Sequence, residues 1–210
     1  MAKKYYAVKK GLTPGVYLTW DECKKMVDGY SGAVYKSFPT LEEALKFAGI
    51  SQQKAESPDE QEDTTVEYPS NLREGQAVAY VDGSYNVATG EYSCGVVLFY
   101  RGQEMHLAEK GTDEELASMR NVAGEILGAR RAMEECIRRG IGALTIYHDY
   151  QGIASWCLGE WKTNKEGTKA YKEYFDSIQD VCQVNFVKVK GHSADKYNDL
   201  ADELAKSVIF

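Results

Sequence analysis

The chain has 210 residues, 43% of them hydrophobic, which is enough for one well-packed core and a small second domain. Its apolar runs are far shorter than the roughly 20 residues of a membrane helix, and its N-terminus lacks the apolar core of a signal peptide, so we expect a soluble, cytoplasmic protein that binds no membrane. The formal net charge of -7 initially argues against a nucleic-acid ligand, and the five scattered cysteines, without a CxxC pair, argue against disulfide frameworks and zinc sites.

The charge is unevenly distributed. Residues 1–50 carry eight lysines against five acidic side chains, whereas residues 51–75 carry two basic against seven acidic ones. Residues 51–75 also lack hydrophobic periodicity and accumulate Gln, Ser and Pro, which predicts a flexible acidic linker. We therefore expect a small basic domain at 1–50, the linker at 51–75 and a larger domain at 76–210.

The first domain is predicted to have the order ββαβα. Alternating apolar residues favour strands at 3–11, 15–20 and 33–38. Two Thr-x-x-Glu patterns, which begin at Thr19 and Thr40, favour a helix after the second strand and another after the third.

The larger domain is predicted to be α/β, with a mixed five-stranded sheet flanked by helices. Three consecutive strands favour an antiparallel meander, and the later alternation of strands and helices favours parallel pairing. The expected strands are 77–84, 93–102, 104–111, 143–149 and 183–191. The expected helices are 115–139, one from about 151, 167–181 and 195–207.

Three acidic residues stand in positions where a site could form. Asp82 in "YVDGSYN" and Asp149 in "TIYHD" end apolar strands, where α/β sheets build sites. A strand-terminal Asp is more often a helix cap or a turn former, but Asp82 leads into another strand and has no helix to cap. Glu125 lies beside the apolar stripe of its helix between Gly124 and Gly128, which permit close approach of a backbone or ligand, although a solvated boundary glutamate is the alternative.

The last helix adds further acidic residues, and their spacing alone does not choose among them. They are Asp195, Asp199, Asp202 and Glu203. If two strand-end aspartates, the helical glutamate and one of these converge, their mutual repulsion requires bound cations, and hard oxygen ligands suit magnesium or manganese. Two such ions about 4 Å apart are a known arrangement for phosphodiester cleavage.

The motifs "YVDGSYN", "RNVAGEILGA", "IYHDYQGI" and "VKVKGHSADKYNDLADELAK" occur in this order across residues 76–210, which closely resemble the type 1 ribonucleases H. Residues 1–50 are similar to the hybrid-binding domain of these enzymes, which some viral inclusion-body proteins also carry. The resemblance implies a ribonuclease H-like fold and an endonuclease that hydrolyses the RNA strand of RNA/DNA hybrids by a two-metal-ion mechanism, giving 5′-phosphate and 3′-hydroxyl ends.

The resemblance also assigns the catalytic residues. It implies that two Mg²⁺ ions, with Mn²⁺ as an alternative, are held by Asp82, Glu125, Asp149 and Asp202, with help from Asn198. Asp82 would bridge both ions, Asp202 would complete the site of the water-activating ion, and Glu125 and Asp149 would hold the ion at the leaving 3′ oxygen. His192 in "KGHS" matches a loop histidine that assists proton transfer or product release, although a lone loop histidine is usually just solvated.

Substrate contacts follow from the same resemblance, with two departures. Ser84 and Asn86 are expected to contact the RNA strand. Arg120 and Asn121 precede the catalytic glutamate where the family contacts the hybrid, but Arg120 replaces an expected Thr or Asn. Lys162 and Thr163 resemble the edge of the DNA-phosphate pocket. The second departure is a missing lysine-rich protrusion, because Trp156 and Trp161 are only five residues apart, and both could also be core aromatics.

The N-terminal domain supplies the basic surface that the larger domain lacks. Lysines interleaved with aromatic residues are typical of backbone binding and base stacking. The match assigns hybrid contacts to Tyr6, Lys9, Lys10, Trp20, Tyr35 and Lys36. Ser37 stands where a second lysine often follows Lys36, and amphipathic strands with solvated lysines explain Lys24, Lys25 and Lys46 better.

Two other functions remain open from the sequence. One is a binding protein that clamps a hybrid or double-stranded RNA on a core without activity, against which the presence of all four carboxylates argues. The other is a DNA nuclease or strand-transfer enzyme of the same fold, which leaves the N-terminal domain unexplained. The expected partner is an RNA/DNA hybrid, and we expect a monomer.

Overall fold

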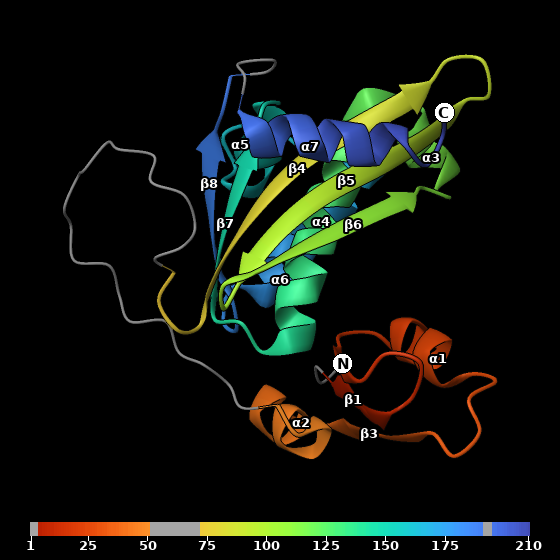
Figure 1. Ribbon diagram of the computed structural model, residues 1–210, viewed down its shortest axis with the longest axis vertical. Coiled ribbons are helices and arrows are strands. Elements are labelled where there is room, and N and C mark those ends of the chain that lie inside the picture. Colours follow the sequence, from red (N-terminus) through yellow and green to blue (C-terminus); the bar gives the residue numbers. More distant parts are fainter. Residues whose placement is uncertain (1–3, 51–71, 191–194) are drawn as a thin grey trace.

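A computed structural model describes residues 4–50, 72–190 and 195–210 (Figure 1). His192 and residues 51–71 of the expected linker lie outside the described residues. Residues 72–75 are described and contact the larger domain, since the Gly142 and Ala143 amides both donate to the Gly75 carbonyl at 3.1 Å. Among the helices of these ranges, none is both long and apolar enough to cross a membrane.

The N-terminal module has the predicted ββαβα order. Its elements are β1 (Tyr5–Lys10), β2 (Gly15–Tyr17), α1 (Trp20–Val27), β3 (Val34–Phe38) and α2 (Leu41–Ala48). The antiparallel sheet has the order β2-β1-β3. Val8 of β1 packs with α1, whereas Ala7 on the opposite face packs with α2. Both helices begin as predicted, because the Thr19 and Thr40 hydroxyls accept hydrogen bonds from the backbone amides three residues later.

The larger domain contains the predicted mixed sheet, with strand order β6-β5-β4-β7-β8. Its strands are β4 (Gln76–Asn86), β5 (Glu91–Tyr100), β6 (Gln103–Lys110), β7 (Ala143–His148) and β8 (Gln183–Lys188). The first three form an antiparallel meander, and β7 and β8 are added in parallel. Its helices are α3 (Glu114–Ala117), α4 (Asn121–Arg139), α5 (Gly152–Cys157), α6 (Glu166–Ile178) and α7 (Lys196–Lys206).

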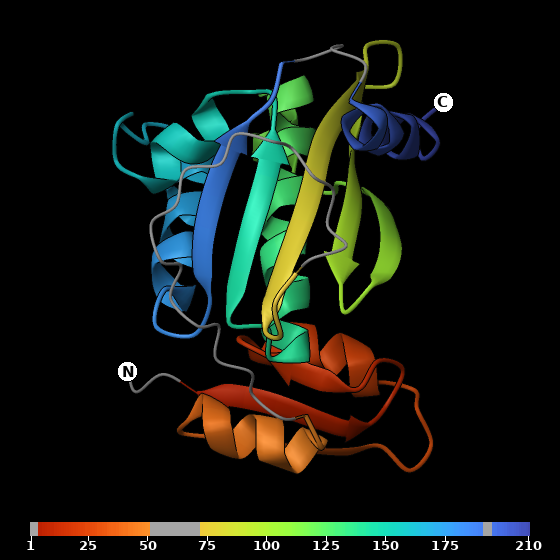
Figure 2. The same cartoon turned by 60° about the vertical axis from the view of Figure 1, so that its left-hand side comes forward.

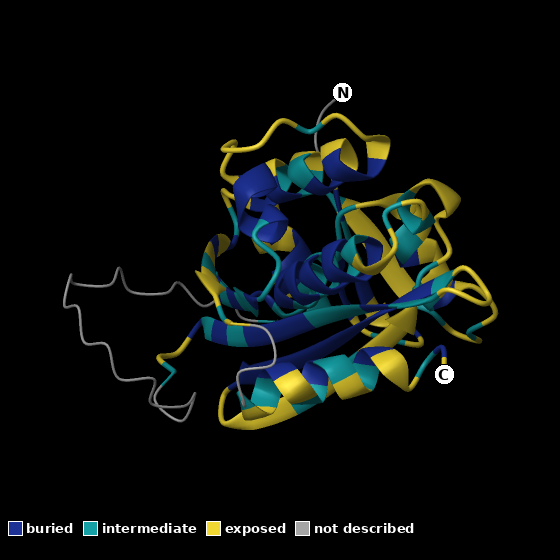
Figure 3. Ribbon diagram, turned by 90° about the horizontal axis from the view of Figure 1, so that it is seen from above, coloured by how far each residue is buried: buried dark blue, intermediate teal, exposed yellow. Residues whose placement is uncertain are grey.

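Helices cover both faces of this sheet. Figures 1 and 2 show α7 across one face and α4 with α6 along the other. The resulting core is dark blue at the centre of Figure 3, and the outward sides of the helices are exposed. The N-terminal module lies at the end of the domain where α4 finishes (Figure 2).

The prediction of one helix over 115–139 was wrong at its start. The chain forms the short helix α3, turns at residues 118–120 and begins α4 only at Asn121. Arg120 has φ 53° and ψ -127°, a conformation that L residues rarely adopt and that no α-helix can contain. The apolar spacing continues through the turn, because Leu116 and Met119 still pack against the core, and spacing alone therefore does not reveal the break.

Glycines allow α4 to lie directly on the sheet. A Cβ atom on Gly124 would stand 2.2 Å from the Ser93 carbonyl oxygen and 2.6 Å from the Gly83 Cα. A Cβ on Gly83 would in turn stand 2.3 Å from the Glu125 amide nitrogen. This backbone contact fixes Glu125 against β4.

Candidate active site

Asp82 and Asp149 come together through the parallel pairing of two strands. Tyr80 of β4 is paired with Tyr147 of β7, so Asp82 and Asp149 each stand two residues further along neighbouring strands. Because side chains alternate between the faces of a sheet, the two carboxylates point to the same side. The Gly83 amide donates a hydrogen bond to Asp82 Oδ1 at 2.7 Å.

Glu125 completes a compact cluster with these two residues. It lies in the first turns of α4 and is only 5% exposed. Oxygen atoms of Asp82, Glu125 and Asp149 all lie within 4.8 Å of one another. One oxygen of Glu125, Oε2, is buried and has no hydrogen-bond partner within residues 4–50, 72–190 and 195–210.

Burial and mutual repulsion disfavour negative charge in this cluster. The pKa of Asp82 is raised from 3.8 to about 6, chiefly by burial and then by the nearby Asp149 carboxylate. Burial, followed by the charge of Asp82, raises the pKa of Glu125 well above its usual value. Bound cations would relieve this repulsion and favour the ionised carboxylates.

The cluster has the chemistry of a divalent-cation site. Among the described residues, three hard carboxylates converge without Cys or His ligands, which is the donor set that suits magnesium or manganese. The unpartnered Glu125 Oε2 is an acceptor that a cation would satisfy. The residues present thus fit divalent metal ions.

Asp202, on α7, acts on this cluster electrostatically but does not belong to its tight group. The Lys206 ammonium donates to Asp202 Oδ2 at 2.6 Å, and the charge of Asp202 contributes to the raised pKa of Asp82. Asn198 of the same helix is buried, and its Oδ1 has no hydrogen-bond partner among the described residues. The two side chains lie four residues apart, on the same side of α7.

The two expected RNA contacts on β4 have different surroundings. Ser84 is 7% exposed and lies within the sheet. The Asn86 side chain donates to the Ile209 carbonyl at 3.0 Å, and its Oδ1 accepts from the Ala88 and Thr89 amides. Asn86 therefore stabilises the turn between β4 and β5 and holds the residues after α7 against this turn.

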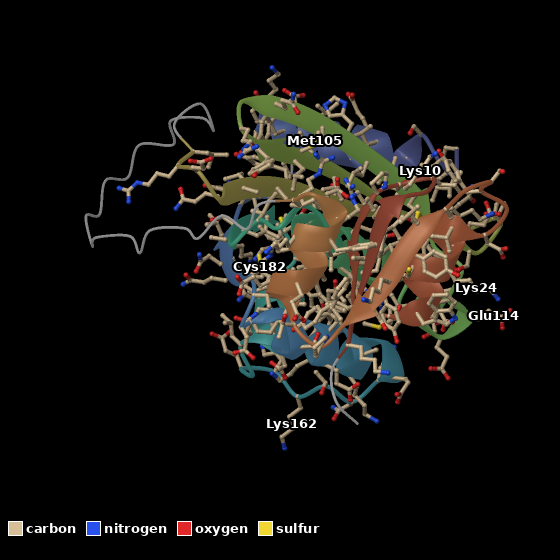
Figure 4. All side chains as sticks on the ribbon, turned by 90° about the horizontal axis from the view of Figure 1, so that it is seen from below. Lys10, Lys24, Met105, Glu114, Lys162 and Cys182 are labelled. Atoms are coloured by element: carbon tan, nitrogen blue, oxygen red, sulfur yellow. The ribbon has the colours of Figure 1, made fainter. Side chains whose placement is uncertain are left out.

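The expected hybrid contacts at the start of α4 are exposed. Arg120 and Asn121 form the N-terminal boundary of α4, five and four residues before Glu125, respectively. Lys162 is also exposed, and Thr163 beside it is half-buried. Figure 4 shows Lys162 reaching outward from the edge of the domain.

Three aromatic side chains form a group next to Asp149, and the sequence did not predict that they would come together. Tyr150, Trp156 and Trp161 have ring centroids 5.8 to 6.3 Å apart. Trp156 is buried, as a core aromatic would be, whereas Trp161 is 42% exposed. The signal that could have found the group is the position of Tyr150 directly after Asp149.

His148, the residue before Asp149, was also not predicted. It is buried, its Nδ1 donates to the Tyr150 carbonyl at 2.9 Å, and its Nε2 has no partner in the described part of the chain. Burial lowers the pKa of this imidazole. The hydrogen bond holds the turn that presents Asp149.

Three aromatic residues of the N-terminal module form a group on the face that α1 covers. The rings of Tyr6 and Trp20 are 5.9 Å apart, and those of Trp20 and Tyr35 are 5.8 Å apart. Trp20 and Tyr35 are 41% and 46% exposed. Lys9, Lys10 and Lys36 are exposed on the same two strands, β1 and β3. We call Tyr6, Trp20 and Tyr35 the aromatic patch.

Two sequence families match the two parts of the chain. Residues 4–48 match the family described as Ribonuclease H1 N-terminal domain. Residues 74–210 match the family described as RNase H. The second match covers more than half of the chain.

Individual relatives agree with these matches. Ribonuclease H1 of Mus musculus is 25% identical over 250 residues, which cover 96% of this chain and 88% of the mouse protein. Ribonuclease H of Caldicellulosiruptor saccharolyticus is 30% identical over 147 residues, which cover 64% of this chain and 96% of that protein. Ribonuclease H of Saccharomyces cerevisiae is 43% identical over 75 residues, but the match spans only 18% of its length.

Solved structures share the fold of the larger domain. The crystal structure of RNase H1 from the archaeon Halobacterium salinarum superimposes with a TM-score of 0.52 and 19% identity, covering 63% of this chain and 96% of the archaeal one. The crystal structure of LC11-RNase H1 in complex with RNA/DNA hybrid superimposes with a TM-score of 0.51 and 16% identity. The match covers 64% of this chain and 99% of the LC11 chain.

Proposed function

The chain belongs to the ribonuclease H family, and from this premise we propose that it is an endonuclease that hydrolyses the RNA strand of RNA/DNA hybrids. The observation that carries the proposal is the partly buried carboxylate cluster of Asp82, Glu125 and Asp149, in which the buried Glu125 Oε2 has no partner among the described residues. The aromatic patch and its neighbouring lysines give the same chain a surface suited to a nucleic-acid duplex.

Two Mg²⁺ ions would be held by Asp82, Glu125, Asp149 and Asp202, with Asn198 as a further oxygen donor. When bound, such ions activate water and stabilise the leaving 3′ oxygen, which gives 5′-phosphate and 3′-hydroxyl ends. The strand pairing and the glycine contact of α4 hold three of the carboxylates at fixed separations before any ion binds. Asp202 would exchange its Lys206 partner for an ion, and its helix is packed on the same sheet through Ala201, Leu200 and Leu204.

The remaining residues orient the substrate and move protons. Arg120 and Asn121 would contact the hybrid at the start of α4, where a guanidinium suits a phosphate oxygen. Ser84 and Asn86 would lie beside the RNA strand, where recognition of the 2′-hydroxyl distinguishes RNA from DNA. His192 would transfer a proton or assist product release. Lys162 and Thr163 would contact the DNA phosphates.

The N-terminal module would raise the concentration of hybrid at the acidic catalytic domain. Residues 1–50 form this hybrid-binding domain and residues 76–210 form the catalytic domain, joined by residues 51–75. Tyr6, Trp20 and Tyr35 would stack on sugars or bases, while Lys9, Lys10 and Lys36 would bind phosphates.

Substrate choice tests this proposal. The native chain is incubated in Mg²⁺ with three duplexes of one sequence, RNA/DNA, RNA/RNA and DNA/DNA, each strand being labelled separately. We expect cleavage of the RNA strand of the hybrid alone, with 5′-phosphate ends. Cutting of the DNA/DNA duplex would instead indicate a DNA nuclease, and binding of the hybrid without cutting would indicate a clamp.

A further inference from the structure

The N-terminal module is packed against the end of the helix that carries Glu125. The Arg138 guanidinium, in the last turn of α4, donates to the Pro14 carbonyl at 3.0 Å. A Cβ atom on Gly15 would stand 2.3 Å from the Arg138 Cγ, so the backbone of the module lies directly on this side chain. A larger residue at position 15 would push the module away from the Arg138 side chain.

Apolar side chains from both sides close the same contact. Leu18 packs against the hydrophobic core of each domain, and Val181, between α6 and β8, packs against the core of the module. A Cβ on Gly140 would stand 3.1 Å from a Leu45 methyl and 3.2 Å from an Ile50 methyl. The module thus buries apolar surface against the larger domain.

Polar residues border this contact. Glu22 of α1 lies 3.7 Å from the Arg130 guanidinium in the middle of α4. On the other side, a cleft of about 440 Å³ is lined by Pro14, Gly49 and Ile50 of the module and by Arg101, Arg138 and Arg139 of the larger domain. The contact therefore follows α4 from Arg130 to its end.

The contact places α1, which begins with Trp20, beside α4, which carries Glu125. Arg130 follows Glu125 by five residues, or about 8 Å along the helix axis. Glu22, its partner in the module, follows Trp20 by two residues. Figure 1 shows α1 below α3 on the same side of the molecule. A duplex along this side can reach the patch and the start of α4 within about one helical turn.

We propose that the N-terminal module works docked on α4, so that the aromatic patch and the carboxylate cluster form one rigid frame that holds a single hybrid at two points. This deepens the proposed function and rests on it for the identity of the ligand. Because both parts belong to one chain, docking is intramolecular, with an effective concentration on the order of millimolar. Even a modest interface then stays closed, and a hybrid held at the patch is aligned with the cluster at the same time.

Small-angle X-ray scattering of the full chain without nucleic acid tests the docking. A compact chain of 210 residues has a radius of gyration of about 17 Å. Val181→Asp places a charge in the contact and should raise this radius by several ångström, and Leu18→Asp, from the module side, should do the same. The matched control is Val187→Asp, at an exposed position on β8 away from the module. Thermal melts show whether each variant remains folded.

Steady-state cleavage of a hybrid then tests the shared frame. We expect Val181→Asp to lower kcat/KM about tenfold while kcat stays within about twofold, because the loss concerns alignment on binding. An extended native chain in scattering would overturn the docking, whatever the activity. A variant that opens yet keeps its kcat/KM would overturn the shared frame. A compact native chain without nuclease activity would refute the proposed function and leave the docking intact.

Discussion

Asp82 and Glu125 are buried beside another carboxylate, and each is therefore easier to protonate than an ordinary acidic residue. The pKa of Asp82 lies near 6 in the folded chain, whereas an unfolded chain releases this proton near pH 4. The folded state thus binds more protons between these values. Without divalent cations, its stability should fall as the pH rises from about 4 to about 7.

Asp82→Asn should remove this loss of stability. The amide has the shape of the acid but carries no charge. The free energy of unfolding of the metal-free variant should therefore exceed that of the native chain by about 3 kcal/mol at pH 8 and by little at pH 4. Chemical denaturation in EDTA at both pH values measures the difference. Asp199→Asn, an exposed position on α7, is the control. An equal difference at both pH values would refute a raised pKa.

Arg120 is held in a backbone conformation that favours glycine. Such conformations cost about 1–3 kcal/mol and often occur at functional sites. Arg120→Gly should therefore stabilise the protein by about 1 kcal/mol and weaken hybrid binding several-fold, because the guanidinium is lost. Arg120→Ala loses the same charge and keeps the strain, so it should weaken binding equally without gaining stability. Unchanged binding in both variants would rule out a phosphate contact.

For single residues, the sequence predicted which acidic side chains could meet, but it did not predict hydrogen bonds between residues far apart in the chain. Asp82, Glu125 and Asp149 converge because Asp149 directly follows β7, Asp82 lies inside the neighbouring strand β4, which continues to Asn86, and Glu125 stands between two helix glycines. The hydrogen bond from Asn86 to the Ile209 carbonyl joins residues 123 positions apart and depends on the packing of the last helix. No local pattern reveals such a bond.

Helix α4 depends on two glycines that make different contacts. A Cβ on Gly124 would collide with the backbone of β4 and β5, whereas a Cβ on Gly128 would come no closer than 3.3 Å to the Cys94 Cβ. Gly124→Ala should therefore destabilise the fold by about 2 kcal/mol or more and displace Glu125, with a large loss of activity. Gly128→Ala has the same gain in helix propensity and should leave the stability of the fold nearly unchanged. Similar melting temperatures for the two variants would contradict the close contact of α4 with the sheet.

The strands and most helices were predictable because their apolar spacing matches their burial. Val81, Val96 and Leu98 alternate with less buried or opposite-facing residues in the sheet, and Thr19 and Thr40 mark the two helix starts of the module. The break before α4 was missed, since Leu116 and Met119 continue the apolar stripe across the turn. Only the backbone conformation of Arg120 distinguishes the turn from a helix.

The composition of the whole molecule predicted two parts of opposite charge but not their contact. The docking of the module depends on Gly15 and Gly140, whose lack of side chains gives no periodic signal. Leu18 and Val181 are also single apolar residues in connecting segments. An interface of this kind is therefore visible only in the folded chain.

The aromatic patch should contribute more to binding than the lysines of α1. Trp20→Ala removes the central ring of the patch and should weaken hybrid binding about tenfold, since stacking contributes about 1–3 kcal/mol per base. Lys24→Ala, also on α1, should change binding less than about twofold. Fluorescence anisotropy with a labelled hybrid, in EDTA to prevent cleavage, measures both. If Lys24→Ala weakened hybrid binding more than Trp20→Ala, the binding surface would lie elsewhere on the module.

The metal dependence of cleavage by Asp149→Asn tests the central claim most directly. The native chain, Asp149→Asn and the control Asp199→Asn are compared on a labelled RNA/DNA hybrid, with and without Mg²⁺, and hybrid binding is measured in parallel. We predict Mg²⁺-dependent cutting of the RNA strand by the native chain and the control, and a loss of more than about 1,000-fold in Asp149→Asn with binding retained. Cutting by Asp149→Asn at the native rate, or by the native chain in EDTA, would contradict a carboxylate-held metal site.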